Sequence, residues 1–222
     1  LLPLLACTPA AAQTLDKIRK QGAITLGYID GAAPFSYADD KGEPQGYSVE
    51  LCRAVADGIA AQLKREALKV RWVKLTIQNR IEAVRKRQVD LECSTTTWTL
   101  SRQSLVDFSL ITFVDGGSLL VGAQSEVGQL KDLDGKRIAV ISGTTTEKSL
   151  RAALAHRKVK AELVGIKTRD EGLTLLGKTE VEALASDRTA LIGVVVMGGG
   201  ARGNFKLLDQ DFSIEQYALM LP

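Results

Sequence analysis

An α/β fold made of two similar units in series is the architecture that the sequence predicts. Short apolar segments typical of strands alternate with amphipathic segments typical of helices. The alternation runs through the first half of the chain and begins again near residue 116. Strands that alternate with helices imply a mostly parallel sheet covered by helices. Two such units are expected to form two lobes with a cleft between them.

The first unit contains a loop rich in Gly, Pro and Asp over 31–47, followed by a helix in which apolar residues recur every three to four positions. Ser48 suits the cap of that helix. The expected elements of this unit are strands over 24–29, 70–75 and 89–93, and helices over 48–63, about 77–87, and a short stretch through Arg102.

The second unit repeats this order. Its expected elements are strands over 116–122, 136–142, 161–166, 181–186, 206–210 and 215–222, and helices over 149–157, 169–180 and 187–196. Ligands of open α/β sheets bind beyond the carboxyl ends of the strands. The residues just after each strand are therefore the first candidates for a site.

Composition excludes several classes of function. The 222 residues are 45% hydrophobic, 25% charged and only 5% aromatic, with a net charge of +3. Basic and aromatic residues are not interleaved as in proteins that bind nucleic acid, so no nucleic-acid partner is expected. The apolar run 191–200 is too short to span a membrane. The single histidine, His156, lies among basic residues, so neither a metal nor a cofactor is expected.

The N-terminal segment 1–13 resembles the end of a secretory signal peptide. The small residues 10–12 fit a cleavage site, which predicts export to the periplasm. In the alternative, Cys7 lies in a lipobox-like sequence and carries a lipid anchor. Cys52 and Cys93 fall at apolar positions and are expected to be small buried side chains, with a disulfide as the alternative in an export compartment.

Two arginines occupy positions that helix electrostatics disfavours. Arg80 and Arg102 each follow a predicted strand and lie in the first turn of a predicted helix. A cation at a helix start costs a few tenths to about 1 kcal/mol unless an anion offsets it. The repetition at two junctions predicts capture of a small anionic ligand. The alternative is that each arginine is solvated or paired with a nearby carboxylate.

Four polar turns at strand ends predict the rest of the site: 76–80, 94–102, 142–148 and 187–189. They offer two guanidiniums, several hydroxyls, free helix-start amides and the carboxylate of Asp187. An amino acid, with a carboxylate and an ammonium, matches this set better than a phosphate does. Each turn also has a local explanation, such as a capping box formed by Thr144 and Glu147.

At these residues the chain resembles the periplasmic solute-binding proteins of polar amino-acid ABC transporters, particularly the glutamate/aspartate-binding branch. The resemblance runs from TLDKIRKQGAITLGY to EQYALML through PFSY, GYSVEL, QNRI, VDLECSTTT, LSRQSLVDFS, DLDGKRIAVISGTTTE and ASDRTAL. It implies the type II periplasmic-binding-protein fold, in which two α/β lobes joined by two crossover strands close on a ligand. The implied division is lobe 1 over 14–113, lobe 2 over 114–212 and a return strand over 213–222, with the C-terminal part of lobe 1 missing. A monomer that delivers its ligand to a membrane permease is expected.

The resemblance also implies roles for individual residues. Arg102 clamps the α-carboxylate of the ligand, assisted by Thr97, Thr144 and Thr145. The α-ammonium is received by Thr95 and Asp187.

Arg80 would read an acidic side chain of the ligand. Three positions depart from the glutamate/aspartate branch: Ile29 stands where that branch has an arginine, Ile77 where it has a serine, and Glu171 where it has a histidine. These changes make the side-chain pocket less cationic.

Two other functions remain open on the same scaffold. One is an enzyme similar to cyclohexadienyl or arogenate dehydratase, for which Glu171 is the candidate general acid/base. The other is the ligand-sensing module of a receptor. No nucleophile elbow or phosphate-binding loop indicates catalysis, so a binding protein without enzymatic activity is predicted.

Overall fold

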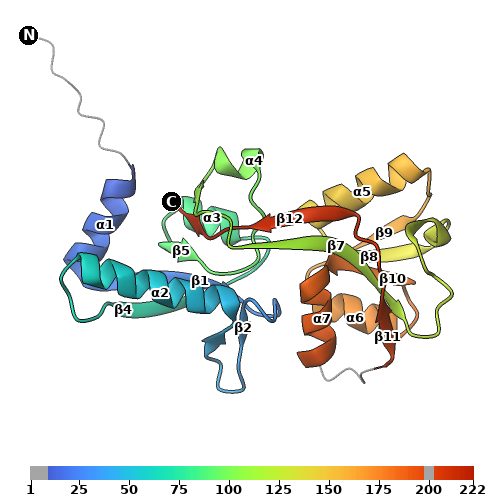
Figure 1. The fold of residues 1–222 in the computed structure, drawn as a ribbon, viewed down its shortest axis with the longest axis horizontal. Coiled ribbons are helices and arrows are strands. Elements are labelled where there is room, and N and C mark those ends of the chain that lie inside the picture. Colours follow the sequence, from blue (N-terminus) through green and yellow to red (C-terminus); the bar gives the residue numbers. More distant parts are fainter. Residues whose placement is uncertain (1–9, 198–202) are drawn as a thin grey trace, which may run out of the picture.

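The computed structural model describes residues 10–197 and 203–222 as two α/β lobes that lie side by side (Figure 1). Each lobe is built around its own sheet, and two long strands connect them. In the described part of the chain, no helix has the length and apolarity needed to cross a membrane.

The sheet of lobe 1 has the strand order β4-β1-β5-β13-β6. The strand β1 is parallel to β4 and β5, whereas β13 pairs antiparallel with both β5 and β6. The elements of this lobe are α1 (Ala10–Gln21), β1 (Ala23–Ile29), β2 (Tyr37–Ala38), β3 (Pro44–Gln45), α2 (Tyr47–Gln62), β4 (Lys69–Leu75), α3 (Arg80–Arg85), β5 (Leu91–Glu92), α4 (Leu100–Gln103), β6 (Asp107–Phe108) and β13 (Met220–Leu221).

The sheet of lobe 2 has the order β11-β7-β10-β8-β9, and β12 pairs with the first part of β7. The strands β8, β9 and β10 are parallel, and β7 runs antiparallel to its three neighbours. Its elements are β7 (Phe113–Gly122), a 3-10 turn (Leu130–Leu133), β8 (Arg137–Ile141), α5 (Thr145–Arg157), β9 (Glu162–Ile166), α6 (Arg169–Gly177), β10 (Ala183–Asp187), α7 (Arg188–Met197), β11 (Phe205–Leu207) and β12 (Ser213–Tyr217).

Both faces of the lobe 2 sheet are covered, which explains its nearly continuous apolar strands. Successive side chains of a strand point to opposite faces. Ile138 and Val140 accordingly belong to one apolar cluster, and Ala139 and Ile141 to the other.

The two connecting strands are β7 and β12, which pair antiparallel between the lobes (Figure 1). Two glycines on β7 permit this close approach. A Cβ at Gly116 would overlap the side chain of Asp211, and one at Gly117 would overlap Ser213 and Phe212. The connection is therefore a tightly packed two-stranded ribbon.

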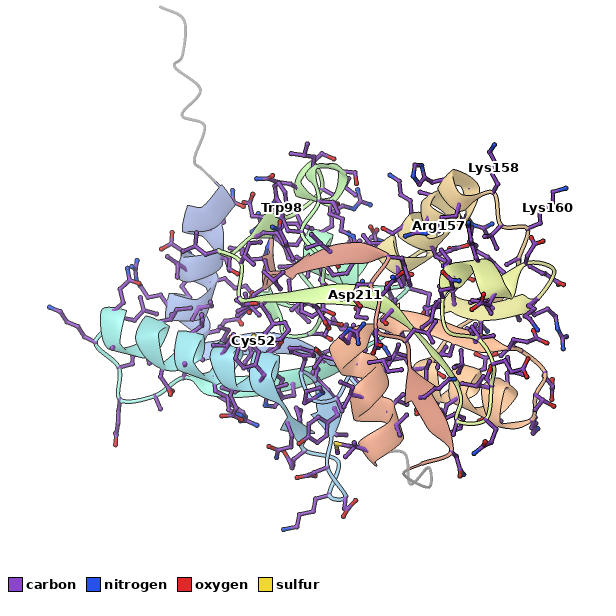
Figure 2. The ribbon with its side chains drawn as sticks, turned by 45° about the vertical axis from the view of Figure 1, so that its right-hand side comes forward. Cys52, Trp98, Arg157, Lys158, Lys160 and Asp211 are labelled. Atoms are coloured by element: carbon purple, nitrogen blue, oxygen red, sulfur yellow. A yellow bond between two sulfur atoms is a disulfide. The ribbon has the colours of Figure 1, made fainter. Side chains whose placement is uncertain are left out.

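Cys52 and Cys93 are buried at apolar positions as expected, and they form a disulfide, which the sequence analysis gave as the alternative. Cys52 lies on α2 (Figure 2) and Cys93 directly follows β5, with their Cα atoms 6.0 Å apart. Both belong to the apolar cluster beneath α2. The bond ties this helix to the centre of the lobe 1 sheet.

Several predicted elements have different bounds. The helix α5 begins at Thr145 rather than near 149, because the Thr144 hydroxyl caps it. The segment 215–222 is not one strand but β12 and β13, which belong to different sheets. Of the predicted signal segment 1–13, residues 10–13 start α1, whereas residues 1–9, including Cys7, lie outside the described residues.

Candidate functional site

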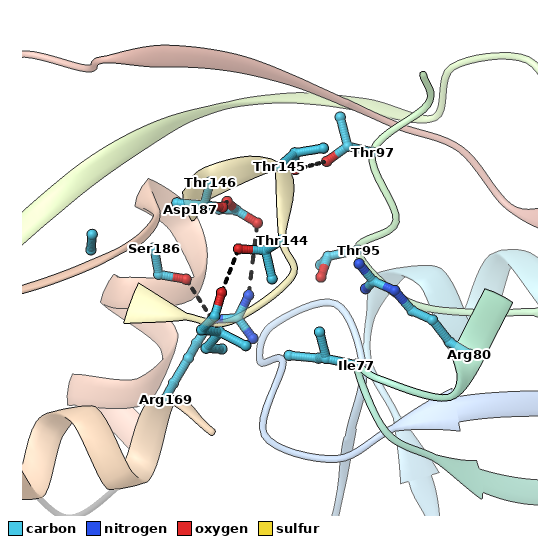
Figure 3. A pocket seen from close by; sticks show the side chains of 12 residues that line it. Ile77, Arg80, Thr95, Thr97, Thr144, Thr145, Thr146, Arg169, Ser186 and Asp187 are labelled. Atoms are coloured by element: carbon cyan, nitrogen blue, oxygen red, sulfur yellow. Dashed lines mark hydrogen bonds and ion pairs between the residues drawn. The ribbon is translucent and has the colours of Figure 1, made fainter. Parts of the chain in front are cut away.

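A small cavity lies between the lobes, beyond the carboxyl ends of β4, β5, β8 and β10 (Figure 3). Its volume is about 20 Å³. The residues that line it come from both lobes: Ile77, Arg80, Thr95, Thr97, Ile141, Thr144, Thr145, Thr146, Arg169, Ala185, Ser186 and Asp187. Most of the predicted site residues therefore meet at one place.

Arg80 is the cation on the lobe 1 side, and it points towards Thr95 (Figure 3). It is the first residue of α3, as the sequence indicates, and it is only 5% exposed. Its Nε has no hydrogen-bond acceptor among the described residues. Burial lowers the pKa of Arg80, and the negative charge of Glu92 counteracts that effect. The guanidinium is thus a desolvated cation without a direct anionic partner in this part of the structure.

Arg102 is buried beside the cavity but does not line it. Its Nη1 donates a hydrogen bond of 2.7 Å to the carbonyl oxygen of Thr97, a residue that lines the cavity. Burial lowers the pKa of Arg102 to about 10, and the nearby Arg80 adds to the effect.

The lobe 2 side is a run of three threonines at the start of α5. Thr144 is the cap, since its Oγ1 accepts the amide of Glu147 at 3.1 Å and donates to the carbonyl of Ile141. Thr144 therefore caps α5, as the local explanation in the sequence analysis proposed, and it also lines the cavity. Thr145 reaches across to Thr97 of lobe 1, with 3.3 Å between the two hydroxyl oxygens.

Asp187, at the end of β10, is 5% exposed and already has several partners. Its carboxylate accepts hydrogen bonds from Thr146 at 2.8 Å and from the hydroxyl of Tyr217 at 2.7 Å. Arg169 forms an ion pair with it at 3.7 Å. Burial raises the pKa of Tyr217 well above its usual value, and the charge of Asp187 adds to this, so the phenol stays a donor.

Arg169 is the functional candidate that the sequence analysis missed. It is the first residue of α6, directly after β9 and its turn, and its Nε donates to Ser186 at 2.8 Å. The signal that identified Arg80, an arginine in the first turn after a strand, was present here as well. Arg169 is buried and faces the cavity from lobe 2.

Glu171 is exposed and does not line the cavity, contrary to its predicted place in the site. It belongs to the cap of α6: its amide donates to Thr168 at 3.2 Å, and its carboxylate accepts the amide of Lys167 at 2.8 Å. A side chain that turns back to its own helix start cannot point into the cleft.

Ile77 lines the cavity as expected, but Ile29 does not. Ile29 is buried and borders a second, wider cavity of about 380 Å³, which is also lined by residues of both lobes. Ile77 and Arg169 line both cavities, so these two side chains stand between the closed pocket and the wider one.

The charge of the pocket favours an anion. Two lining guanidiniums, Arg80 and Arg169, stand against the single lining carboxylate of Asp187, which leaves one positive charge in excess. Within the described ranges, no cluster of His, Cys, Asp and Glu has the arrangement of a metal site.

Comparison with known families and sequences gives one consistent match. The family described as bacterial extracellular solute-binding proteins, family 3, matches residues 24–207. The glutamate/aspartate import solute-binding protein of Salmonella typhimurium is 32% identical over 213 residues, which cover 96% of this chain and 70% of that protein. The L-glutamate/L-aspartate-binding protein of Pseudomonas aeruginosa is 36% identical over 181 residues, which cover 81% of this chain and 60% of that protein. The chain therefore spans about two thirds of the length of these relatives.

Solved structures share the fold. A periplasmic binding protein from Brucella ovis, solved with glutathione bound, has a TM-score of 0.84 and 28% identity, covering 94% of this chain and 64% of that one. An ancestral amino acid-binding protein described as a precursor of cyclohexadienyl dehydratase has a TM-score of 0.78 and 24% identity, covering 94% of this chain and 85% of that one. Both likenesses agree with the type II periplasmic-binding-protein fold.

Proposed function

Because the chain belongs to family 3 of the bacterial extracellular solute-binding proteins, we propose that it captures an acidic amino acid between its lobes. We further propose that it acts outside the cytoplasm and delivers this ligand to the permease of an ABC transporter. Relatives named as glutamate/aspartate binders support the ligand class.

The observation that carries the proposal is the buried guanidinium of Arg80. A charge removed from water is costly unless an opposite charge and hydrogen bonds replace its hydration. The ion pairs of the described chain do not include Arg80, and its Nε lacks an acceptor. A carboxylate on the ligand side chain would supply both the charge and the missing acceptor.

Asp187 is suited to the α-ammonium of the ligand. A carboxylate offers about four acceptor positions, and the hydrogen bonds from Thr146 and Tyr217 account for two. The remaining positions can accept from an ammonium, with the Thr95 hydroxyl on the opposite wall of the pocket.

Binding requires the lobes to separate. A cavity of about 20 Å³ has room for about one water molecule, whereas an amino acid is several times larger. The ligand must therefore enter an opened cleft, and the ribbon formed by β7 and β12 is the connection about which the lobes would move.

Isothermal titration calorimetry with the twenty amino acids tests the proposal. Wild-type protein is expected to bind glutamate or aspartate more tightly than glutamine or asparagine. We expect Arg80→Met to remove this preference, a loss of at least about tenfold in affinity for the acidic ligand, because one charged hydrogen bond contributes about 1.5–3 kcal/mol. Arg102→Ala is expected to abolish binding of every amino acid while the protein stays folded.

Arg85→Ala is the matched control, since Arg85 lies on the same helix but is exposed and paired with Glu82. It should leave affinity unchanged. Equal affinities of wild type and Arg80→Met for glutamate would contradict the side-chain assignment, and unchanged binding by Arg102→Ala would contradict the α-carboxylate assignment.

A second candidate ligand is a γ-glutamyl peptide such as glutathione, the molecule bound to the Brucella ovis protein. The wider cavity beside Ile77 and Arg169 favours it, because it offers space for a ligand that extends beyond the inner pocket. Titration with glutathione alongside glutamate separates the two, and the ligand with the higher affinity is the better candidate.

We propose binding without turnover. The candidate general acid/base, Glu171, is engaged with the amide of Lys167 and lies outside the pocket, and the relatives are named as binding proteins. Conversion of arogenate by the purified protein would contradict this.

A further inference from the structure

The strand β12 contributes a buried carboxylate that contacts both lobes. Glu215 is 1% exposed, and its Oε2 accepts hydrogen bonds from the hydroxyl of Thr97 at 2.7 Å and of Thr145 at 2.8 Å. Thr97 belongs to lobe 1 and Thr145 to lobe 2. Its other oxygen, Oε1, accepts from Ser213 at 2.8 Å. One side chain on the connecting ribbon thus holds a hydroxyl of each lobe.

These two hydroxyls have no second proton to donate. A threonine hydroxyl carries one proton, and both point to Glu215. The contact between Thr97 and Thr145 is longer, at 3.3 Å, so the shorter bonds to the carboxylate are the stronger ones. Neither threonine can donate to a ligand carboxylate while it remains bonded to Glu215.

The next residue on the same face of β12 bonds to another residue that lines the pocket. Tyr217 donates its hydroxyl proton to Asp187 at 2.7 Å, whereas Ile214 between Ser213 and Glu215 is largely exposed. The ribbon therefore presents a carboxylate to the hydroxyl donors and a phenol to the aspartate. These are the contacts expected of an amino acid with its α-carboxylate and α-ammonium.

We propose that Glu215 is an internal competitor for the ligand carboxylate: it holds the lobes together through Thr97 and Thr145, and a bound carboxylate takes over these two hydroxyls. Only the competition with a ligand carboxylate rests on the proposed function. The hydrogen bonds by which Glu215 joins the two lobes are present without a ligand. In this scheme Glu215 lowers the affinity for the ligand, because the ligand carboxylate has to displace it from Thr97 and Thr145.

Two measurements on Glu215→Gln test the proposal. A neutral amide accepts hydrogen bonds more weakly than a carboxylate, so the lobes should separate more readily. Small-angle X-ray scattering without added amino acid should then give a larger radius of gyration than for wild type. In calorimetry the variant should bind the amino acid that wild type binds about tenfold more tightly, because the ligand no longer displaces a charged acceptor.

Asp211→Asn is the control of equal charge change. Asp211 lies just before β12 and pairs with Arg188, away from both threonines. It should change neither the radius of gyration nor the affinity. If Glu215→Gln does not fold, Thr145→Val provides the same scattering test, since it removes one of the two bonds and preserves the shape of the side chain.

The outcomes separate this inference from the proposed function. If wild type binds no amino acid or peptide, the proposed function fails, while the scattering comparison still decides whether Glu215 holds the lobes together. If wild type binds an amino acid but Glu215→Gln binds it more weakly, Glu215 supports the site and competition is wrong. Identical radii of gyration for wild type, Glu215→Gln and Thr145→Val would contradict the proposal that Glu215 holds the lobes together.

Discussion

The two lobes differ in how far the buried polar groups in and near the pocket are hydrogen-bonded. On the lobe 2 wall, Arg169, Ser186, Asp187 and Thr146 bond to one another. On the lobe 1 side, five buried polar atoms have no hydrogen-bond partner among the described residues: Arg80 Nε, both carboxylate oxygens of Glu92, Ser94 Oγ and Thr96 Oγ1.

This difference indicates that the two lobes have different roles in ligand binding. Buried polar groups are normally satisfied, and the exceptions need an explanation. The polar side chains that line the pocket from lobe 2 bond to one another. Lobe 1 contains Arg80, a buried cation whose Nε has no acceptor among the described residues, so lobe 1 has more to gain from an anionic ligand. We expect the ligand to bind lobe 1 first and lobe 2 to close over it.

Lobe 1 also contains the disulfide, and breaking that bond should produce the largest effect. The disulfide between Cys52 and Cys93 closes a loop of 41 residues, for which chain entropy gives a stabilisation of about 4 kcal/mol. Replacing both cysteines by Ala should lower the free energy of unfolding by about that amount. Urea unfolding monitored by circular dichroism measures it.

Lobe 2 is the internal reference for that experiment. Because the described part of lobe 2 contains neither cysteine, hydrogen exchange of β8, β9 and β10 should change much less than exchange of β1 and β5. Equal loss of protection in both lobes would mean that they unfold as one unit.

The network of lobe 2 should be the next most sensitive feature. Asp187→Asn leaves the buried Arg169 without its counter-charge and removes the charged acceptor of Thr146 and Tyr217. Breaking a buried ion pair costs about 3–5 kcal/mol, so we expect destabilisation by about 3 kcal/mol. Thermal unfolding provides the test, with Asp209→Asn at an exposed site as control. A change below about 0.5 kcal/mol would show that the network contributes no more than an ordinary surface contact.

The pH dependence of stability should reveal the unsatisfied carboxyl of lobe 1. Burial raises the pKa of Glu92 above its ordinary value of 4.5, against the opposing charges of Arg80 and Arg102. The folded protein therefore binds this proton more tightly than the unfolded chain, and stability falls as the pH rises from about 4.5 through the raised pKa.

Glu92→Gln removes this titration, so its stability should depend less steeply on pH than that of wild type over the same interval. Chemical unfolding at a series of pH values gives the two slopes. Parallel slopes would show that Glu92 titrates alike in the folded and unfolded states.

The smallest effect is expected at Glu171. Glu171→Ala removes one bond to the amide of Lys167 and a negative charge from the start of α6, which is worth up to about 1 kcal/mol. Thermal unfolding should show this modest loss, and calorimetry should show unchanged ligand affinity. Weaker ligand binding by Glu171→Ala would contradict the conclusion that Glu171 lies outside the binding site.

Local patterns in the sequence predicted the α/β alternation and most of the pocket. Arg80, Thr95, Thr97, Thr144, Thr145 and Asp187 follow strand ends, and parallel strands bring such positions to one edge. A first-turn arginine is a local signal, and the same signal applied to 169 would have added Arg169.

Contacts between residues far apart in the sequence could not be predicted from such local patterns. Glu215 and Tyr217 lie inside a strand, and only the return of β12 along β7 brings them to the pocket. The pairing of Cys52 with Cys93 depends on α2 crossing the end of β5. Arg102 is buried as a cation, but it bonds to the backbone of Thr97 and does not line the pocket, which no spacing rule reveals.

The insertion of β13 between β5 and β6 has a consequence for how the chain is made. Lobe 2 is contiguous from β7 to β12, whereas the lobe 1 sheet lacks the strand between β5 and β6 until residues 220 and 221 are synthesised. A nascent chain emerging from the ribosome can thus finish its second half before its first. Removal of β13 would leave β6 without its only sheet neighbour in the described structure. The loss of the last strand to be synthesised would thus destabilise lobe 1, most of which is synthesised first.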